Sequence, residues 1–191
     1  MKEQKKFHIL QSAHALFWKH GFKRVSIEEV CRHSRVSKMT FYHYFPNKVE
    51  VAKAVFDKIV NEGNIRFKQM MQEQPGPEKF VQNLLLLKLE TTKSISKEFL
   101  QDFYSHPELG LKQYVEEKTR YEWRIRMQEL KIAQKKGLFR KEVDLEFFFQ
   151  MIMKMGELVS DETLMKIFKK PQDLIMALAK LLTYGIAVPE K

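Results

Sequence analysis

Helical spacing of apolar residues runs through almost the whole chain and constrains its fold more than any other feature. Near the N-terminus, Ile9, Leu10, Ala13, Leu16 and Phe17 recur three and four residues apart, which is the period of one helix face. Sustained apolar–polar alternation, typical of a half-buried strand, occurs nowhere in the 191 residues. The sequence therefore predicts an all-α protein.

Helix-start and helix-stop residues divide this pattern into about nine or ten helices. Ser26 and Ser37 have side chains that cap a helix N-terminus, and Gly21 and Gly137 stand where helices end. Asn47 and Asp144 are further N-terminal caps. The expected helices span about residues 4–20, 26–34, 37–44, 47–72, 77–94, 97–104, 107–136, 144–159, 161–169 and 171–186.

The strongest interior break is the segment Gln74-Pro75-Gly76-Pro77. The predicted division has an N-terminal three-helix helix-turn-helix domain over residues 1–47 and a C-terminal helical domain over residues 48–191. In this division the helix at 48–72 links the two domains.

Positive charge is concentrated in the first quarter of the chain. The whole chain has a formal net charge of +10, and residues 1–50 carry ten Lys and Arg against four Asp and Glu. A basic segment of this kind favours a polyanionic partner such as nucleic acid. An ordinary solvated basic surface is the alternative interpretation.

Cysteine usage and apolar runs limit the other classes of protein. The single Cys31 excludes an internal disulfide and a cysteine zinc cluster, and we expect it to be a small core residue. The charged N-terminus lacks the apolar region of a signal peptide, and the longest apolar run, Leu84–Leu87, is too short to cross a bilayer. We therefore expect a cytoplasmic protein with no membrane partner, no metal and no cofactor.

The helix predicted at 37–44 has the pattern of a helix that enters the major groove of DNA. At 100° per residue, Phe41 and Phe45 point to one side, which packs inward. Met39 and His43 point to the opposite side. The major groove is about 12 Å wide and admits one α-helix, so this polar side is the one expected to meet base edges.

Two blocks of residues carry a resemblance to a known family. Residues 25–31 (VSIEEVC) and 36–48 (VSKMTFYHYFPNK) resemble the TetR family of regulators, and the similarity covers about residues 7–56. The resemblance implies that Tyr42 and Lys48 contact phosphates and that Lys38, Thr40, His43 and Tyr44 approach bases. The predicted DNA-binding residues are Ser26, Arg35, Ser37, Lys38, Met39, Thr40, Tyr42, His43, Tyr44 and Lys48.

Two of these residues depart from the family pattern. Arg35 stands in the turn where the family usually has Gly, so it either adopts a strained positive φ or the turn is reshaped. Met39 stands where a small residue is usual, and its thioether would favour contact with thymine methyl groups.

The C-terminal domain is rich in aromatic and Met residues at helical spacing. The resemblance implies an effector pocket between the helix at 48–72 and those near 77–136, and a four-helix dimer bundle formed by the last long helices. The same residues would also suit an ordinary helical core. The predicted pocket residues are Phe99, Phe103, Tyr104, Tyr114, Tyr121, Trp123 and Met127. The predicted dimer-interface residues are Phe148, Met151, Ile152, Met155, Leu174, Ile175, Leu178, Leu181 and Leu182.

These features together predict a homodimeric transcription regulator that is not an enzyme. We expect a repressor that binds a palindromic operator in double-stranded DNA and is released by a small apolar or aromatic ligand. No P-loop, dinucleotide-binding, zinc-protease or nucleophile-elbow motif is present in the sequence. An enzyme, and a helical module that binds a membrane surface or another protein, are the alternatives.

Overall fold

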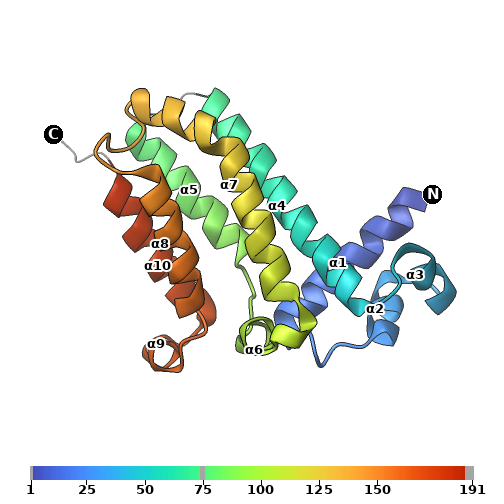
Figure 1. Cartoon of the computed structure of the whole chain (residues 1–191). Coiled ribbons are helices and arrows are strands. Elements are labelled where there is room, and N and C mark those ends of the chain that lie inside the picture. The colour runs from blue at the N-terminus through green and yellow to red at the C-terminus, as the bar shows by residue number, and fades with distance from the viewer. Residues whose placement is uncertain (1, 74–75, 188–191) are drawn as a thin grey trace. The chain divides into compact units, whose positions relative to one another are not determined.

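The expected all-α class is confirmed. The computed structural model describes residues 2–73 and 76–187, and those residues contain no strand (Figure 1). The elements in these residues are α1 (Lys2–His20), α2 (Ile27–Ser34), α3 (Lys38–Tyr44), α4 (Lys48–Gln72), α5 (Pro77–Thr91), α6 (Lys97–Ser105), the 3-10 helix η1 (Pro107–Leu109), α7 (Leu111–Lys135), α8 (Leu145–Leu158), α9 (Glu162–Ile167) and α10 (Pro171–Ile186).

The chain folds into two compact units, each made of separate stretches of sequence. Unit 1 contains Met1–Val60 and Ser94–Val115, and unit 2 contains Asn61–Lys93 and Glu116–Lys191. This division does not follow the boundary expected after residue 47. Helix α6 and the first residues of α7 belong with the N-terminal helices, and α4 and α7 each have residues in both units.

The caps of unit 1 are those expected from the sequence. The Ser26 hydroxyl oxygen accepts a hydrogen bond from the Glu29 N–H at 3.1 Å, and the Ser37 hydroxyl oxygen accepts one from the Thr40 N–H at 3.1 Å. These bonds satisfy N–H groups that have no partner inside a helix. They explain why two helices as short as α2 and α3 begin where they do.

Contacts between α1 and α6 bring distant parts of the sequence together in unit 1. The Ser96 N–H donates to the Trp18 carbonyl oxygen at 2.8 Å, and the rings of Trp18 and Phe99 have centroids 4.2 Å apart. The Lys23 N–H donates to an Asp102 carboxylate oxygen at 2.7 Å. The aromatic pair and the backbone bond together explain why residues 94–115 fold with the N-terminal helices.

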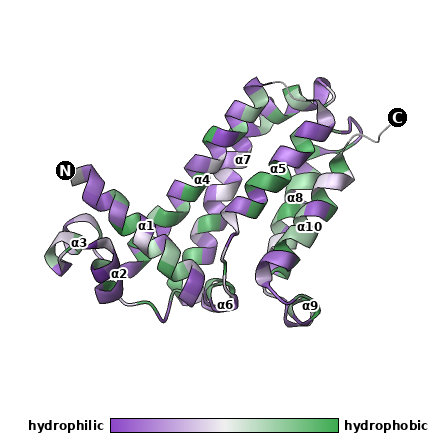
Figure 2. Cartoon of the chain, turned by 180° about the vertical axis from the view of Figure 1, so that it is seen from behind, coloured by the Kyte–Doolittle hydropathy of each residue, from purple (hydrophilic) through white to green (hydrophobic). Residues whose placement is uncertain are grey.

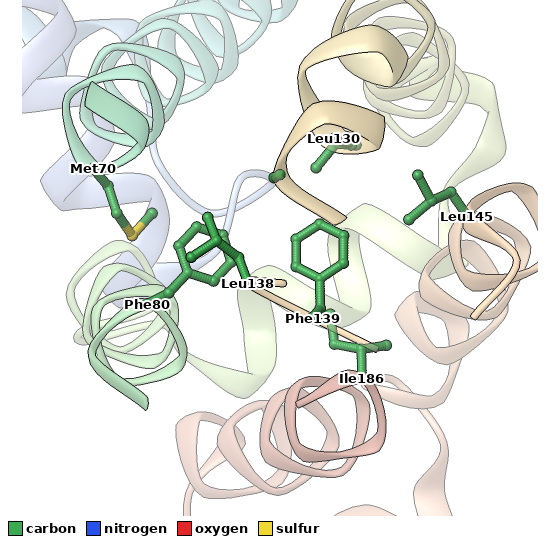
Figure 3. Packing of buried hydrophobic residues seen from close by; sticks show 8 residues of the cluster. Met70, Phe80, Leu130, Leu138, Phe139, Leu145 and Ile186 are labelled. Atoms are coloured by element: carbon green, nitrogen blue, oxygen red, sulfur yellow. The ribbon is translucent and has the colours of Figure 1, made fainter. Parts of the chain in front are cut away.

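A hydrophobic cluster forms the core of unit 2. Figure 3 shows its side chains converging on the space between α4, α5, α7, α8 and α10. Phe80 of α5 and Phe139, from the loop before α8, have ring centroids 5.9 Å apart. The buried members of the cluster are Met70, Phe80, Leu130, Ala133, Leu138, Phe139, Leu145 and Ile186.

Helices α5 and α10 run in opposite directions within unit 2. The Gln172 side chain, at the start of α10, donates to the Leu89 carbonyl oxygen near the end of α5 at 2.9 Å. At the other end, Ile186 joins the cluster that contains Phe80. Helices α8 and α10 lie side by side in both views, and hydrophobic and hydrophilic residues are intermixed along each of them in Figure 2.

One predicted helix was wrong in its start. A single helix was expected over 107–136, but Gly110 adopts φ 64°, so η1 ends there and α7 begins at Leu111. Glycine reaches this left-handed conformation without a side-chain clash. Gly110 therefore separates η1 from α7. The spacing of apolar residues alone did not reveal this break.

Gly21 provides the first test of unit 1. It has φ +83°, and a Cβ there would lie 2.9 Å from an Asp102 carboxylate oxygen and 3.1 Å from the Glu98 Cβ. We expect Gly21→Ala to lower the free energy of unfolding by roughly 1–3 kcal/mol, because it combines backbone strain with a clash against α6. Urea unfolding followed by circular dichroism measures the change.

Gly63→Ala in α4 is the matched control. A Cβ at Gly63 meets no atom within 4 Å, so the substitution should be neutral or should stabilise the helix by about 0.5–1 kcal/mol. Equal effects of the two substitutions would contradict the close approach of α6 to Gly21.

Candidate functional site

Helix α3 presents the side that the sequence predicted. Phe41 is 1% exposed and Phe45 is 5% exposed, so both belong to the core of unit 1, as expected. Met39 is 85% exposed and Tyr42 is 49% exposed, and His43 is also exposed. An exposed row of polar and apolar side chains on a buried anchor is the arrangement that major-groove recognition requires.

The turn before α3 keeps a left-handed residue although no glycine is present. Arg35 is the C-cap of α2 with φ 55° and ψ 40°. The next N–H, that of Val36, donates to the Cys31 carbonyl oxygen at 3.0 Å. A left-handed non-glycine residue costs about 1–2 kcal/mol. The Arg35 side chain is exposed. The strained turn therefore carries a positive charge on the surface just before α3.

An ion pair on the exposed surface joins α2 to the start of α3. The Lys38 ammonium contacts the Glu28 carboxylate, and both side chains are more than half exposed. The hydrogen bond from Lys38 lowers the pKa of Glu28, and the same bond raises the pKa of Lys38. Lys38 must therefore leave Glu28 before its ammonium can contact a base.

Thr40 and Tyr44 are less exposed than the other residues predicted to approach bases. The Thr40 and Ser37 hydroxyl oxygens lie 3.0 Å apart, and both Thr40 and Tyr44 are half-buried. The His43 ring meets the Tyr44 ring edge-on, with centroids 5.1 Å apart. The Ser37–Thr40 contact lies at the first turn of α3, and the His43–Tyr44 ring pair lies at its last turn.

Lys48 has a structural environment that the sequence did not indicate. Its ammonium donates to the carbonyl oxygens of Phe22 at 2.8 Å, Lys23 at 3.2 Å and Val25 at 2.9 Å. It also lies 4.5 Å from the centre of the Phe22 ring. Burial lowers the pKa of Lys48. The ammonium has three donors, so in this arrangement all are used to hold the loop between α1 and α2.

An apolar cavity lies in unit 2. Its volume is about 330 Å³, within the usual range for small-molecule sites. Helix α5 contributes Phe80, Leu84 and Lys88, which recur every four residues and so share one face. The cavity is lined by Phe67, Phe80, Leu84, Lys88, Trp123, Leu130, Phe139, Leu145, Phe148, Ile152, Met155, Gly156, Val159, Ile175, Leu178, Ala179, Leu182, Thr183 and Ile186.

Of the seven predicted pocket residues, Trp123 lines this cavity. Phe99 and Phe103 are instead buried in unit 1, where they pack with Phe56. Met127 packs against the hydrophobic cluster of unit 2. These residues fill cores, which was the alternative that their spacing left open.

The predicted tyrosines also lie away from the cavity. The Tyr114 hydroxyl donates to both Asp57 carboxylate oxygens at 2.9 Å. Burial and the Asp57 carboxylate raise the pKa of Tyr114 to about 12. Tyr104 packs edge-on against Phe103, and Tyr121 is exposed.

The predicted dimer residues of α8 and α10 mostly face the cavity or the core. Five of them, Phe148, Ile152, Met155, Leu178 and Leu182, line the cavity, and Ile175 lines it while also being buried. Leu174 is buried and Met151 is half-buried. Leu181 of α10 is 64% exposed, and Phe147 and Leu158 of α8 and Tyr184 of α10 are exposed too.

Comparison with known proteins agrees with this geometry. The family model described as bacterial regulatory proteins of the tetR family matches residues 9–55, which include α2, α3 and the turn between them. The whole chain is similar in fold to the fatty acid degradation regulator FadR from Bacillus halodurans, with a TM-score of 0.67, 19% identity and 95% of each chain covered.

Residues 9–55 of this chain are therefore similar to the N-terminal region of the tetR family of bacterial regulatory proteins. The transcriptional regulator FadR from Bacillus subtilis, solved in complex with stearoyl-CoA, has a similar fold as well. Its TM-score is 0.63 at 16% identity, with 94% of this chain and 98% of that chain covered. A curated relative is the HTH-type transcriptional regulator EthR from Mycolicibacterium smegmatis, which is 24% identical over 100 residues. That match spans 52% of this chain and 41% of the relative, so less than half of the relative's length is covered.

The family model ends at residue 55 and does not cover the helices that follow. Within residues 2–73 and 76–187, no helix is both long enough and apolar enough to span a membrane.

Lys48 yields a test that separates a structural role from phosphate contact. We expect Lys48→Met to lower the free energy of unfolding by about 1.5–3 kcal/mol, because the carbonyl oxygens of the loop lose their charged donor. Met keeps most of the apolar stem that packs near Phe22. Lys19→Met, at an exposed position on α1, is the control and should change stability little. Unchanged stability of Lys48→Met, with weaker DNA binding, would assign the ammonium to phosphate alone.

Proposed function

We propose that this protein is a homodimeric, ligand-responsive transcription regulator, and more specifically a repressor that binds a palindromic operator. The observation that carries the proposal is the exposed side of α3, anchored by Phe41 and Phe45. A helix so anchored offers Met39, Tyr42 and His43 to a groove without losing core contacts.

The residues around α3 suit contact with the DNA backbone. Ser26 and Ser37 stand at helix N-termini, where N–H groups and the helix dipole favour a phosphate. Arg35 and Tyr42 are exposed nearby in sequence. We assign Tyr42 and Arg35 to phosphates and the side chains of Lys38, Met39, Thr40, His43 and Tyr44 to the groove.

Dimerisation is proposed to use the exposed apolar side of α8 and α10. Phe147 and Leu158 of α8 and Leu181 and Tyr184 of α10 are large apolar or aromatic residues open to solvent. The two helices lie side by side (Figures 1 and 2). An apolar surface on two adjacent helices can pack against its own copy around a two-fold axis to form a four-helix bundle. Two recognition helices in fixed register would then read two half-sites.

The cavity of unit 2 is the proposed effector site. Apolar walls with few polar groups are typical of small-molecule sites, and the Bacillus subtilis FadR of similar fold was solved with stearoyl-CoA. Helices α4 and α7 each have residues in both units, so they are the elements through which occupancy would be coupled to α3. The change in DNA affinity that a ligand causes cannot exceed the difference between its affinities for the DNA-binding and the released conformation.

Salt dependence tests the DNA contacts. A duplex selected from a random library by the protein is titrated at several salt concentrations. Each neutralised phosphate adds about 0.9 to the slope of log K against log salt, so binding should weaken steeply. Glu28→Gln removes the carboxylate that holds Lys38, and we expect tighter binding with a slope larger by about 1.

Glu108→Gln on η1 is the control for this charge change. Glu108 pairs with His106 instead of a residue of α3, so its removal should alter affinity much less. A flat salt response, or failure to select any preferred sequence, would overturn the DNA-binding proposal.

Leu181→Asp tests the dimer. Two new carboxylates near a symmetrical apolar interface should weaken association at least about a hundredfold. Size-exclusion chromatography with light scattering measures the mass over a dilution series. Ile65→Asp, which changes a similarly exposed apolar residue (58%) on α4, should leave the mass unchanged. A wild-type protein that is monomeric at all concentrations would contradict the proposed dimer.

A further inference from the structure

Lys88 is the charged side chain among the residues that line the cavity of unit 2. It extends the face of α5 that begins with Phe80 and Leu84, so its position follows an apolar stripe. The antiparallel packing of α5 and α10 places Lys88 near the start of α10, through the Gln172–Leu89 contact. Phe80 and Ile186 lie at the opposite end. The cavity is thus apolar at one end and cationic at the other.

No described residue pairs with the Lys88 ammonium. Glu90, the nearest carboxylate in sequence, is paired with Arg66. The hydroxyls of Thr91 and Thr92 donate to the Lys88 carbonyl oxygen and do not serve the ammonium. Lys88 is exposed by its accessible surface, although desolvation by the surrounding helices lowers its pKa. Its side chain is therefore accessible at the cavity.

The cation at position 88 interrupts an apolar stripe. A methionine or leucine there would continue the apolar wall that Phe80 and Leu84 begin. The lysine instead gives one end of the cavity a positive charge, with which the head group of a bound anion can pair.

A second donor in the cavity wall also lacks an acceptor. The Trp123 indole N–H is buried and has no hydrogen-bond partner among the described residues, and Trp123 lines the cavity. A buried donor left without an acceptor costs about 1–3 kcal/mol. The indole nitrogen is closed off from the cavity space, so the Lys88 ammonium is the unpaired donor that a bound molecule can reach.

We propose that the cavity binds an apolar carboxylic acid whose carboxylate pairs with Lys88 and whose hydrocarbon body extends toward Ile186. This inference rests on the proposed effector role of the cavity and specifies the ligand class. One cation matches one monoanionic head group. A nucleotide or another group with several phosphates would need further cations, and Lys88 is the one charged residue among those lining the cavity.

Three probes of equal chain length test the charge requirement without DNA. Isothermal titration calorimetry is run with decanoate, 1-decanol and decylammonium. We expect the wild type to bind decanoate about tenfold to a hundredfold more tightly than 1-decanol, the range given by a charged hydrogen bond. Decylammonium should bind most weakly because it places a second cation beside Lys88.

Variants at position 88 assign the preference to the lysine. Lys88→Met should bind decanoate and 1-decanol equally. Lys88→Arg should keep a preference for decanoate. Lys79→Met, an exposed position on α5 outside the cavity lining, is the control and should behave like the wild type.

The outcomes separate this inference from the proposed function. Equal binding of decanoate and 1-decanol by the wild type, binding of neither, or tighter binding of decanoyl-CoA that Lys88→Met leaves unchanged would each overturn the inference. Lys88-dependent decanoate binding would support it. A subsequent operator titration then tests regulation alone: unchanged operator affinity with decanoate bound would contradict the effector role and leave the ligand class in place.

Discussion

Burial of Phe41 is the interaction on which the proposed DNA-reading surface depends. Helix α3 has seven residues, and a helix of that length is not stable in water by itself. The cap at Ser37 and the turn at Arg35 fix where the helix begins, and the buried rings of Phe41 and Phe45 fix its rotation. These two buried rings set the direction of every exposed residue of α3. The energy stored in the left-handed Arg35 is tolerable because the same packing holds both sides of the turn.

Local chemistry made most helix boundaries predictable. Side chains that cap, such as Ser26 and Asp144, act within three residues, and the structure contains both bonds. Gly21 and Gly137 have positive φ at the ends of their helices, as their type suggests. The orientation of α3 was also predictable, because 100° steps over a short helix leave little room for error.

Contacts between residues far apart in the sequence could not be predicted from local patterns. Phe99 and Trp123 have similar local patterns, but one fills the core of unit 1 and the other lines the cavity of unit 2. Nothing within a few residues of Lys48 reveals that its ammonium meets the carbonyl oxygen of Phe22, 26 positions earlier. Lys88 is the exception among the missed residues. Its spacing of four residues from Leu84, and of eight from Phe80, indicates that a lysine lies on the same helix face as two apolar residues.

The discontinuous composition of unit 1 has a consequence for how the protein is made. Helices α1, α2 and α3 emerge from a ribosome long before α6, yet Trp18 needs Phe99 and the Lys23 N–H needs Asp102, which lies 79 positions later. The nascent N-terminal segment must wait with this aromatic surface uncovered until residues through Val115 have been synthesised. During that interval nascent-chain chaperones have an apolar site to bind, and the contacts that complete unit 1 form only after residues 94–115 have left the ribosome.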